Sequence, residues 1–360
     1  MIKYLGSKRL LCTPIVAAAH GFGGVQRVLD LFSGTARVGR AFKESGLTVT
    51  ANDHLAFAHV LARCYVAADR TRWLEPATAL LDELARVPPE EGYFTQAFCR
   101  DARYIQPKNG ARIDAIRDAI AERELPEPLE AIALTALMEA ADRVDSTTGV
   151  QMAYLKKWSQ RSVKDLELRV PAMLDGEGTA LCLDAAEAAE MDVDVAYLDP
   201  PYNQHSYLGN YHVWETLVRR DAPEAYGVAN KRVACREYKN PFNSRVRIEE
   251  AFRAVVERTR APHLIVSFND EGFLDRDTLL TILRARGEVR VVEVDFKRYV
   301  GAQIGIFNPK GDKVGRVSHL RNREMLFLVS ADRARVDAAE RACREALAAP
   351  SKPGVALSPR

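Results

Sequence analysis

The chain reads VLDLFSGTARVGRAF from Val28 to Phe42, and this stretch decides the class of fold. Residues 28–32 are apolar enough to predict a buried strand, residues 33–39 form a glycine-containing turn, and a helical pattern follows through Ala41 and Phe42. A strand, a glycine turn and a helix hold nucleotides or cofactors at the carboxyl edge of a doubly wound sheet. We therefore predict a doubly wound, Rossmann-like α/β fold.

The glycine turn favours an adenosine cofactor without a pyrophosphate. It lacks the G-x-G-x-x-G pattern because position 36 is alanine, and it lacks the Lys-Ser or Lys-Thr pair of a P-loop. The next predicted strand, residues 47–51, ends at Asn52-Asp53, about 20 residues after the turn. A carboxylate at this place can accept hydrogen bonds from ribose hydroxyls, and it can equally cap a helix. Asp53 is suited to both roles.

A second motif, D-P-P-Y from Asp199 to Tyr202, follows the apolar strand predicted at residues 195–198. Neither proline can donate a backbone hydrogen bond, so the strand ends in a stiff turn at the mouth of the sheet. There the Asp199 side chain and the Pro200 carbonyl can accept hydrogens from one exocyclic NH2 group, and Tyr202 can stack on a flat base. The alternative is an ordinary strand-to-loop turn with an exposed aspartate. His205, Tyr207 and His212, which follow closely, either line the base pocket or are structural.

Taken in order, these motifs resemble the Dam-like group of DNA adenine-N6 methyltransferases, from Met1 to about Val329. The K-Y-L-G-S-K-R segment at residues 3–9 resembles the N-terminal motif of that group. The resemblance implies a Rossmann-like sheet, S-adenosylmethionine as cofactor, and methyl transfer to adenine N6 after base flipping. It implies that Asp199, Pro200 and Tyr202 are catalytic. Its cofactor-binding residues correspond to Tyr4, Lys8, Asp30, Phe32, Ser33, Gly34, Asp53, Asp184 and Ala185. Position 36 departs from the family pattern, because it is alanine here and glycine in many members of the group. The alanine side chain should narrow the cofactor loop slightly.

Alternative functions use related motifs. Aspartate at the first position of D-P-P-Y favours adenine N6, whereas cytosine-N4 enzymes more often have serine, and RNA or protein amino-methyltransferases usually have asparagine. A cytosine-C5 enzyme would need a nucleophilic cysteine after a proline, and none of the six cysteines follows one. A DNA-binding module without activity is a further alternative, which the complete set of motif residues disfavours.

Composition indicates a globular enzyme of a reducing compartment. The chain has 360 residues, of which 47% are hydrophobic, enough for a large domain with an inserted module. The six cysteines form no C-x-x-C pair, so we expect neither a metal site nor a disulfide framework. The sequence shows neither a signal peptide nor an 18-residue apolar run, and we predict a cytoplasmic location, at the nucleoid when bound to DNA. The expected partners are double-stranded DNA and a restriction endonuclease for the same site, with no membrane.

The net charge of +2 does not indicate nucleic-acid binding, but the basic residues are unevenly distributed along the chain. They concentrate in residues 229–247, in residues 296–324 and in the 154–164 segment, which follows a polar turn at 145–149. Basic side chains in such loops can neutralise phosphates, although a solvated protein surface has the same composition. We expect this edge and these loops to face DNA through Lys156, Lys157, Lys231, Arg232, Arg236, Lys239, Arg245, Lys297 and Arg298.

The predicted elements divide the chain into three parts. Residues 1–65 and 179–330 form the catalytic domain, with further strands expected at 180–183, 263–268, 290–295 and 324–329, the last of them closing the sheet. Residues 66–178 are predicted to be a helical insertion that recognises the target, with helices at 77–87, 110–123 and 129–141. Residues 331–360 form a C-terminal helix and a flexible tail.

Overall fold

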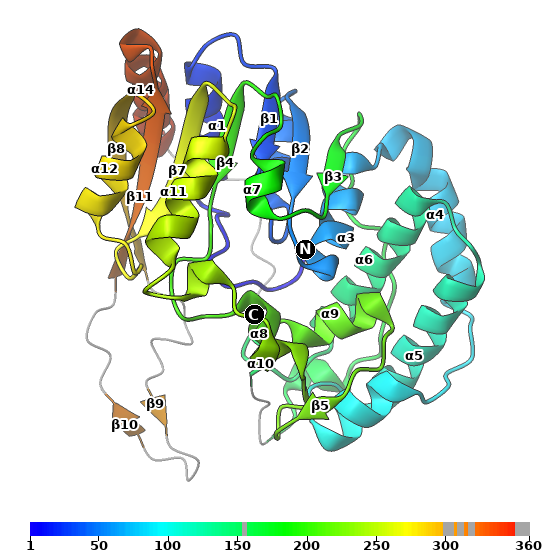
Figure 1. The fold of residues 1–360 in the computed structure, drawn as a ribbon. Helices are drawn as coiled ribbons and strands as arrows, with labels where there is room; N and C mark the ends of the chain where they lie inside the picture. The colour runs from blue at the N-terminus through cyan, green and yellow to red at the C-terminus, as the bar shows by residue number, and fades with distance from the viewer. Residues whose placement is uncertain (153–156, 298–305, 308–312, 316–320, 350–360) are drawn as a thin grey trace.

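A seven-stranded sheet runs through the centre of the molecule, in the order β3-β2-β1-β4-β7-β11-β8 (Figure 1). The computed structural model describes residues 1–152, 157–297, 306–307, 313–315 and 321–349. Strands β1, β2, β3, β4 and β7 are parallel, and β11 is antiparallel to both of its neighbours. The strands are β1 (Arg27–Asp30), β2 (Thr48–Asn52), β3 (Thr179–Leu181), β4 (Val195–Leu198), β7 (His263–Asn269), β8 (Glu288–Lys297) and β11 (Arg321–Ser330). The predicted α/β sheet and its seven strands are confirmed.

One detail of the predicted sheet is wrong, because β11 does not close it. This last strand inserts between β7 and β8, where Leu326 pairs with Ser267 on one side and Val292 on the other. The edge strand at this end of the sheet is β8, whose mixed apolar and charged sequence suits a strand with one open side. The inner position of β11 explains its apolar run, since residues 325–329 are buried.

Helices cover both faces of the sheet, as the doubly wound class requires (Figure 1). Adjacent strand residues point to opposite faces, so Val28 joins one apolar core and Leu29 the other. One core contains residues of α1 (Cys12–Gly21), α2 (Arg37–Glu44) and α14 (Arg333–Ala348), and the other contains residues of α7 (Ala185–Ala188), α11 (Ile248–Arg258) and α12 (Arg276–Arg284). Burial on both faces is the reason that these strands have nearly continuous apolar sequences.

The segment between β2 and β3 is helical, and no strand occurs in its described residues, 53–152 and 157–178. Its side chains do not form a core of their own, since Leu134 and Ile116 belong to the same apolar cluster as Val49 of the sheet. The elements are α3 (Ala56–Ala62), the π-helical η1 (Arg63–Ala67), α4 (Arg70–Leu84), the π-helical η2 (Thr95–Asp101), α5 (Pro107–Glu122), α6 (Glu127–Arg143) and the 3-10 turn η3 (Gln160–Val163).

The connection from β4 to β7 packs on these helices, so this helical half of the molecule is built from two separate stretches of chain (Figure 1). Val213 and Leu217 of α9 lie in the apolar cluster that also contains Leu134. Before it reaches α11, the connection forms α8 (Tyr207–Asn210), α9 (His212–Arg219), a small ladder of β5 (Ala225–Tyr226) and β6 (Lys231–Arg232), α10 (Ala234–Glu237) and the 3-10 turn η4 (Pro241–Asn243). A second small ladder joins β9 (Ile306–Phe307) and β10 (Lys313–Gly315).

The order of the strands reverses direction between β1 and β4. From β1 the chain adds β2 and β3 on one side, and it then crosses to add β4 and β7 on the other. In open α/β sheets a ligand binds beside the carboxyl ends of the two strands at such a switch point. Those ends are Asp30 and Leu198, directly before Asp199. In the described part of the chain, no helix has the length and apolar character needed to cross a membrane.

Candidate active site

One pocket borders the carboxyl ends of both β1 and β4, and it brings together residues that are far apart in sequence. All nine residues predicted to bind the cofactor line it, and Asp199 lines it as well. Pro201 lines the pocket too, whereas Pro200 and Tyr202 are not among its lining residues. The fold therefore places the cofactor motif and the D-P-P-Y motif in one site.

The glycine turn is held by two carboxylates. Asp30 is buried, and its Oδ2 accepts a hydrogen bond from the Gly39 N–H at 2.8 Å. Asp53 accepts from the Gly34 N–H at 2.9 Å and from the Leu55 N–H at 3.0 Å, so it ties the glycine turn to the residues just before α3. The alternative role of Asp53 as a helix cap is wrong, because the first N–H groups of α3, those of Ala56 and Phe57, donate to the Glu215 carboxylate. Each Asp53 oxygen keeps a second lone pair that can accept a hydrogen bond from a ligand.

Ala36 adopts a left-handed conformation at φ 57°. Glycine occupies this region without a steric penalty, which is a physical reason for glycine at this position in the resembled pattern. The alanine follows Gly34, at φ 52°, where an added Cβ would approach the Tyr4 ring to 3.1 Å. The loop is thus narrow at Gly34 because the aromatic ring of the N-terminal segment lies against it.

Tyr4, which lines the pocket, is one of three stacked tyrosines. Its ring centroid lies 5.1 Å from that of Tyr207 and 4.7 Å from that of Tyr211, with nearly parallel planes. Tyr207 also lines the pocket, whereas His205 is exposed. His212 is fully buried, and its Nε2 pairs with the Gln151 carbonyl at 2.9 Å. Burial lowers the pKa of His212 to about 3, so this side chain is a neutral, structural histidine.

Asp199 lies beside a buried lysine. Its Oδ1 is 3.0 Å from Lys8 Nζ, which also lies 2.7 Å from Oε1 of Glu324. Burial raises the pKa of Asp199 to about 6; Lys8 opposes this rise, and Glu324 adds to it. The Tyr202 hydroxyl accepts a hydrogen bond from Asn269 Nδ2 at 2.8 Å, and its ring lies 5.9 Å from Lys8 Nζ.

A second wall of the pocket comes from residues that the sequence analysis assigned to a DNA-facing loop. Tyr238, Asn240, Phe242 and Asn243 all line the pocket. Phe242 is buried, and its ring makes an edge contact with the Phe32 ring at 5.3 Å. Asn243 Nδ2 donates to the Asn203 carbonyl at 2.7 Å. In the sequence, residues 240–243 (N-P-F-N) indicate a turn, but a four-residue turn does not indicate which part of the protein it packs against.

A comparison with protein families shows which family the chain belongs to. The model of the family described as D12 class N6 adenine-specific DNA methyltransferase matches residues 4–270, about three quarters of the chain. The chain belongs to this family. The predicted resemblance to DNA adenine-N6 methyltransferases is confirmed, and with it the class of enzyme.

Curated relatives of this D12 methyltransferase are modification enzymes. It is 28% identical over 344 residues to the Type II methyltransferase M.NlaIII of Neisseria lactamica, covering 91% of this chain and 98% of that protein. It is 29% identical over 320 residues to the modification methylase StsI of Streptococcus sanguinis, covering 83% of this chain and 49% of that protein. It is 29% identical over 294 residues to the Type II methyltransferase M.FokI of Planomicrobium okeanokoites, covering 75% of this chain and 45% of that protein. The D12 chain thus spans about half the length of StsI and M.FokI.

The basic residues predicted to contact DNA have different surroundings in the D12 methyltransferase. Lys157, Arg236, Lys239 and Arg245 are exposed, and Lys231 is half-buried, with its Nζ against Met152 Sδ. The prediction for Arg232 is corrected, because this side chain is buried and forms an ion pair with Asp221, which precedes β5. Lys156, Arg298 and the side chain of Lys297 lie outside the described residues.

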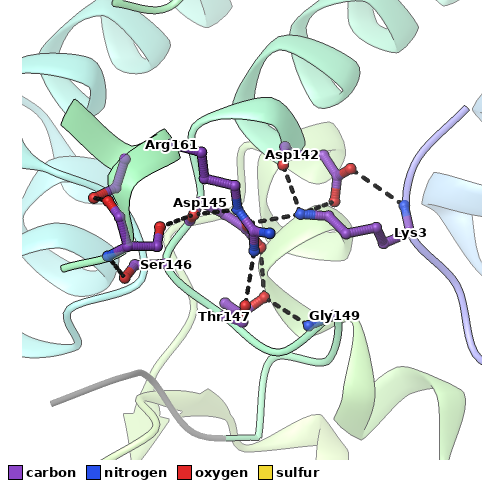
Figure 2. Close-up of polar contacts among 9 residues, drawn as sticks. Lys3, Asp142, Asp145, Ser146, Thr147, Gly149 and Arg161 are labelled. Atoms are coloured by element: carbon purple, nitrogen blue, oxygen red, sulfur yellow. Dashed lines mark hydrogen bonds and ion pairs between the residues drawn. The ribbon is translucent and has the colours of Figure 1, made fainter. Parts of the chain in front are cut away.

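The polar turn at 145–149 is also corrected, since Asp145, Ser146 and Thr147 are buried and take part in contacts within the protein (Figure 2). Asp145 is buried and pairs with Lys3 and with Arg161, while Lys3 also contacts Asp142. The Thr147 hydroxyl donates to Asp145 and accepts the Gly149 N–H at 3.1 Å. We call Lys3, Asp142, Asp145, Thr147 and Arg161 the Lys3 cluster. It joins the N-terminal segment to the end of α6, so Arg161 is engaged within the protein.

The six cysteines of the D12 chain are free thiols. Burial raises the pKa of the Cys12 and Cys343 thiols to about 11, which keeps them protonated and poorly nucleophilic. No group of metal-ligating side chains occurs among the described residues.

Proposed function

We propose that this chain transfers a methyl group from S-adenosylmethionine to N6 of an adenine within a specific sequence of double-stranded DNA. The observation that carries the proposal is the single pocket that Asp199 shares with all nine predicted cofactor residues. The family gives the class of reaction, and this pocket supplies a place where a donor and an amine can meet.

The residues of the pocket fit the proposed cofactor. Oδ1 of Asp30 is buried without a hydrogen-bond partner among the described residues, so it can accept a donor from the cationic amine of the ligand. Asp53 can accept from ribose hydroxyls, while Phe32, Asp184 and Ala185 form the side of the pocket proposed for the adenine ring. Tyr4, Lys8, Ser33 and Gly34 complete the set. When bound, the cofactor supplies an electrophilic methyl group on a sulfonium, whose departure needs no metal.

The chain itself would act by positioning and by electrostatics. The Asp199 carboxylate and the Pro200 carbonyl would accept the two hydrogens of the adenine amine and favour the tetrahedral nitrogen that attacks the methyl group. Flipping the adenine out of the duplex costs a few kcal/mol, and stacking on Tyr202 would return about 1–3 kcal/mol. Exposed Lys157, Arg236, Lys239 and Arg245, with the half-buried Lys231, are proposed to contact phosphates.

The deciding experiment uses labelled S-adenosylmethionine and unmethylated bacterial DNA, followed by digestion to nucleosides and identification by mass. N6-methyladenine is the expected product. N4-methylcytosine would overturn the base assignment, and a product on RNA but not on DNA would overturn the substrate. Mapping the modified positions would then give the recognition sequence.

The proposed DNA surface has a separate test. Lys157→Gln and Arg236→Gln should weaken DNA binding and lower its salt dependence by about one unit of slope each. Arg260→Gln is the matched control, because Arg260 is exposed just before β7 begins, away from the carboxyl edge. Equal salt slopes for all three variants would remove this surface from the proposal.

We also propose that the enzyme works beside a restriction endonuclease of the same specificity. The proposal rests on the names of its relatives, a modification methylase and a Type II methyltransferase. DNA as substrate makes the cytoplasm the proposed location. Protection of fully modified DNA from a nuclease that cuts the mapped site is the expected outcome.

A further inference from the structure

A buried acid lies behind the proposed catalytic carboxylate. Glu324 is on β11, where it pairs with Asn269 of β7 and Val294 of β8, so it reaches the site from the far half of the sheet. Its Oε1 lies 2.7 Å from Lys8 Nζ and accepts a hydrogen bond from the Ser267 hydroxyl at 2.7 Å. We call Lys8, Asp199, Glu324 and Ser267 the Lys8 cluster.

The Lys8 cluster places one ammonium between two carboxylates. The side chains of Lys8 and Glu324 are 7% and 11% exposed, so water screens their interaction poorly. Burial by itself would lower the pKa of Lys8, but Asp199 and Glu324 raise it well above its usual value. Two anions therefore hold Lys8 as a cation, and the contact with Glu324 is the shorter of the two.

This arrangement bears on how a base can reach Asp199. Lys8 contacts Oδ1 of Asp199, a carboxylate that must also accept a hydrogen from the target amine. If Asp199 were the sole partner of Lys8, the incoming amine would have to displace a buried ammonium and leave it without a counterion, which is costly. Glu324 removes this cost, because it keeps the ammonium paired when Asp199 turns to the base.

We propose that Glu324 is a positioning residue that retains Lys8 and thereby leaves Asp199 free to accept the hydrogen of the target amine. Ser267 supports it by fixing the orientation of the Glu324 carboxylate. This inference rests on the proposed function, and it adds a residue from the antiparallel strand to a site otherwise built at the β1–β4 switch point.

Glu324→Gln is the central variant, since it removes the charge and keeps the shape. At saturating cofactor and DNA, the single-turnover rate of methyl transfer should fall at least about tenfold, because small misplacements of reacting groups cost up to about 100-fold. Cofactor affinity should change less than the rate, because Asp30 and Asp53 are intact. The acid limb of the rate profile should move to lower pH, because Glu324 raises the pKa of Asp199. Tyr197, which also faces Asp199, is unchanged in this variant.

The matched control is Glu293→Gln, on the neighbouring strand β8. Glu293 is 38% exposed and pairs with Arg276 and Arg323 at the surface, so the same chemical change there should leave the rate unaltered. Equal rates for the two variants would overturn the proposal. Ser267→Ala, which removes a single hydroxyl, should lower the rate about two- to threefold and provides a test should Glu324→Gln fold poorly.

A double-mutant cycle separates positioning from general packing. If Glu324 acts through Lys8, then Glu324→Gln should have little further effect on the rate in a Lys8→Met background. Rates that multiply independently would show that Glu324 has another role and would overturn the proposal.

Chemical labelling tests the cluster without relying on methyl transfer. An amine-acylating reagent, followed by mass spectrometry, should modify Lys8 several-fold faster in Glu324→Gln than in Glu293→Gln, because one of the two retaining anions has been removed. Unchanged labelling would overturn the role of Glu324. Absence of DNA methylation by the unaltered protein, with the labelling difference intact, would instead count against the proposed function alone.

Discussion

Two clusters of charged side chains start in the N-terminal segment, and they differ in the balance of positive and negative charge. The Lys3 cluster pairs two carboxylates with two cations, Lys3 and Arg161, and Asp145 also accepts the Thr147 hydroxyl (Figure 2). In the Lys8 cluster, by contrast, one described cation lies between Asp199 and Glu324. A balanced, hydrogen-bonded network is rigid, whereas a site with excess negative charge can accept another donor. We infer that the Lys3 cluster stabilises the fold, whereas the Lys8 cluster can bind a further hydrogen-bond donor from a substrate.

The burial of the two clusters supports this distinction. Asp145 is 4% exposed and lies away from the pocket, while Asp199 is 18% exposed and lines it. Burial raises the pKa of Asp142 in the Lys3 cluster to about 6, and Lys3 opposes this rise. Substitutions in the first cluster should therefore change stability, and substitutions in the second should change methyl transfer.

The largest expected effect is that of Asp199→Ala. Loss of the acceptor should reduce the rate of methyl transfer by at least about 1,000-fold, in the range for preorganised catalytic groups. Cofactor binding by calorimetry should change less than about threefold, because Asp30 and Asp53 are intact. Asp192→Ala, at an 84% exposed position, serves as the control. Near-normal turnover by Asp199→Ala would assign its role to another group.

The counterpart in the Lys3 cluster is Asp145→Ala. It leaves Lys3 and Arg161 without their shared carboxylate and should lower the free energy of unfolding by about 3 kcal/mol. Asp165→Ala removes an exposed partner of Lys108 from the same helical region and should cost less than about 0.5 kcal/mol. Urea unfolding of both variants measures the difference. Equal stabilities would mean that the Lys3 cluster does not hold the junction.

The pH dependence of transfer sharpens the comparison further. Asp199 must be ionised to accept the amine hydrogen, and its pKa is raised to about 6. The rate should therefore rise about tenfold per pH unit below pH 6 and level off above it. Single-turnover rates between pH 5 and 8 test this at saturating cofactor, a condition chosen because burial also raises the pKa of Asp30 to about 7. A rate that is constant across this range would contradict the assignment.

The smallest expected effect is that of Lys3→Met. Lys3 is 32% exposed, and Arg161 would remain on Asp145, so the free energy of unfolding should fall by only about 1 kcal/mol. The rate of methyl transfer should stay within about twofold. A loss of transfer as large as that of Lys8→Met would show that the two clusters do not have separate functions. Thermal unfolding and single-turnover assays on both variants make the comparison.

Local sequence patterns predicted the sheet and most of the pocket. The strands are buried on both faces, so each is a short apolar run that stands out from the chain, and the run from Val195 to Leu198 matches β4 residue for residue. The cofactor turn and D-P-P-Y were recognisable because glycine and proline restrict the backbone at the ends of those strands. Parallel strands of such a sheet present their carboxyl ends at one edge, which is why these motifs met in one pocket.

Tertiary structure decided which charged and aromatic side chains are available. Arg232 is predicted from sequence to contact DNA, and Arg161 lies in the basic 154–164 segment, yet each forms an ion pair within the protein, with Asp221 and Asp145 respectively. Phe242 reached the pocket because its turn folds back on Phe32, more than 200 positions away. Glu324 reached Lys8 because β11 inserts beside β7 instead of closing the sheet. By itself, the sequence determined the strands, their turns and the chemistry of the motifs, since these depend on neighbouring residues. The pairing of distant charges depends on strand order and packing, and only the folded chain could decide it.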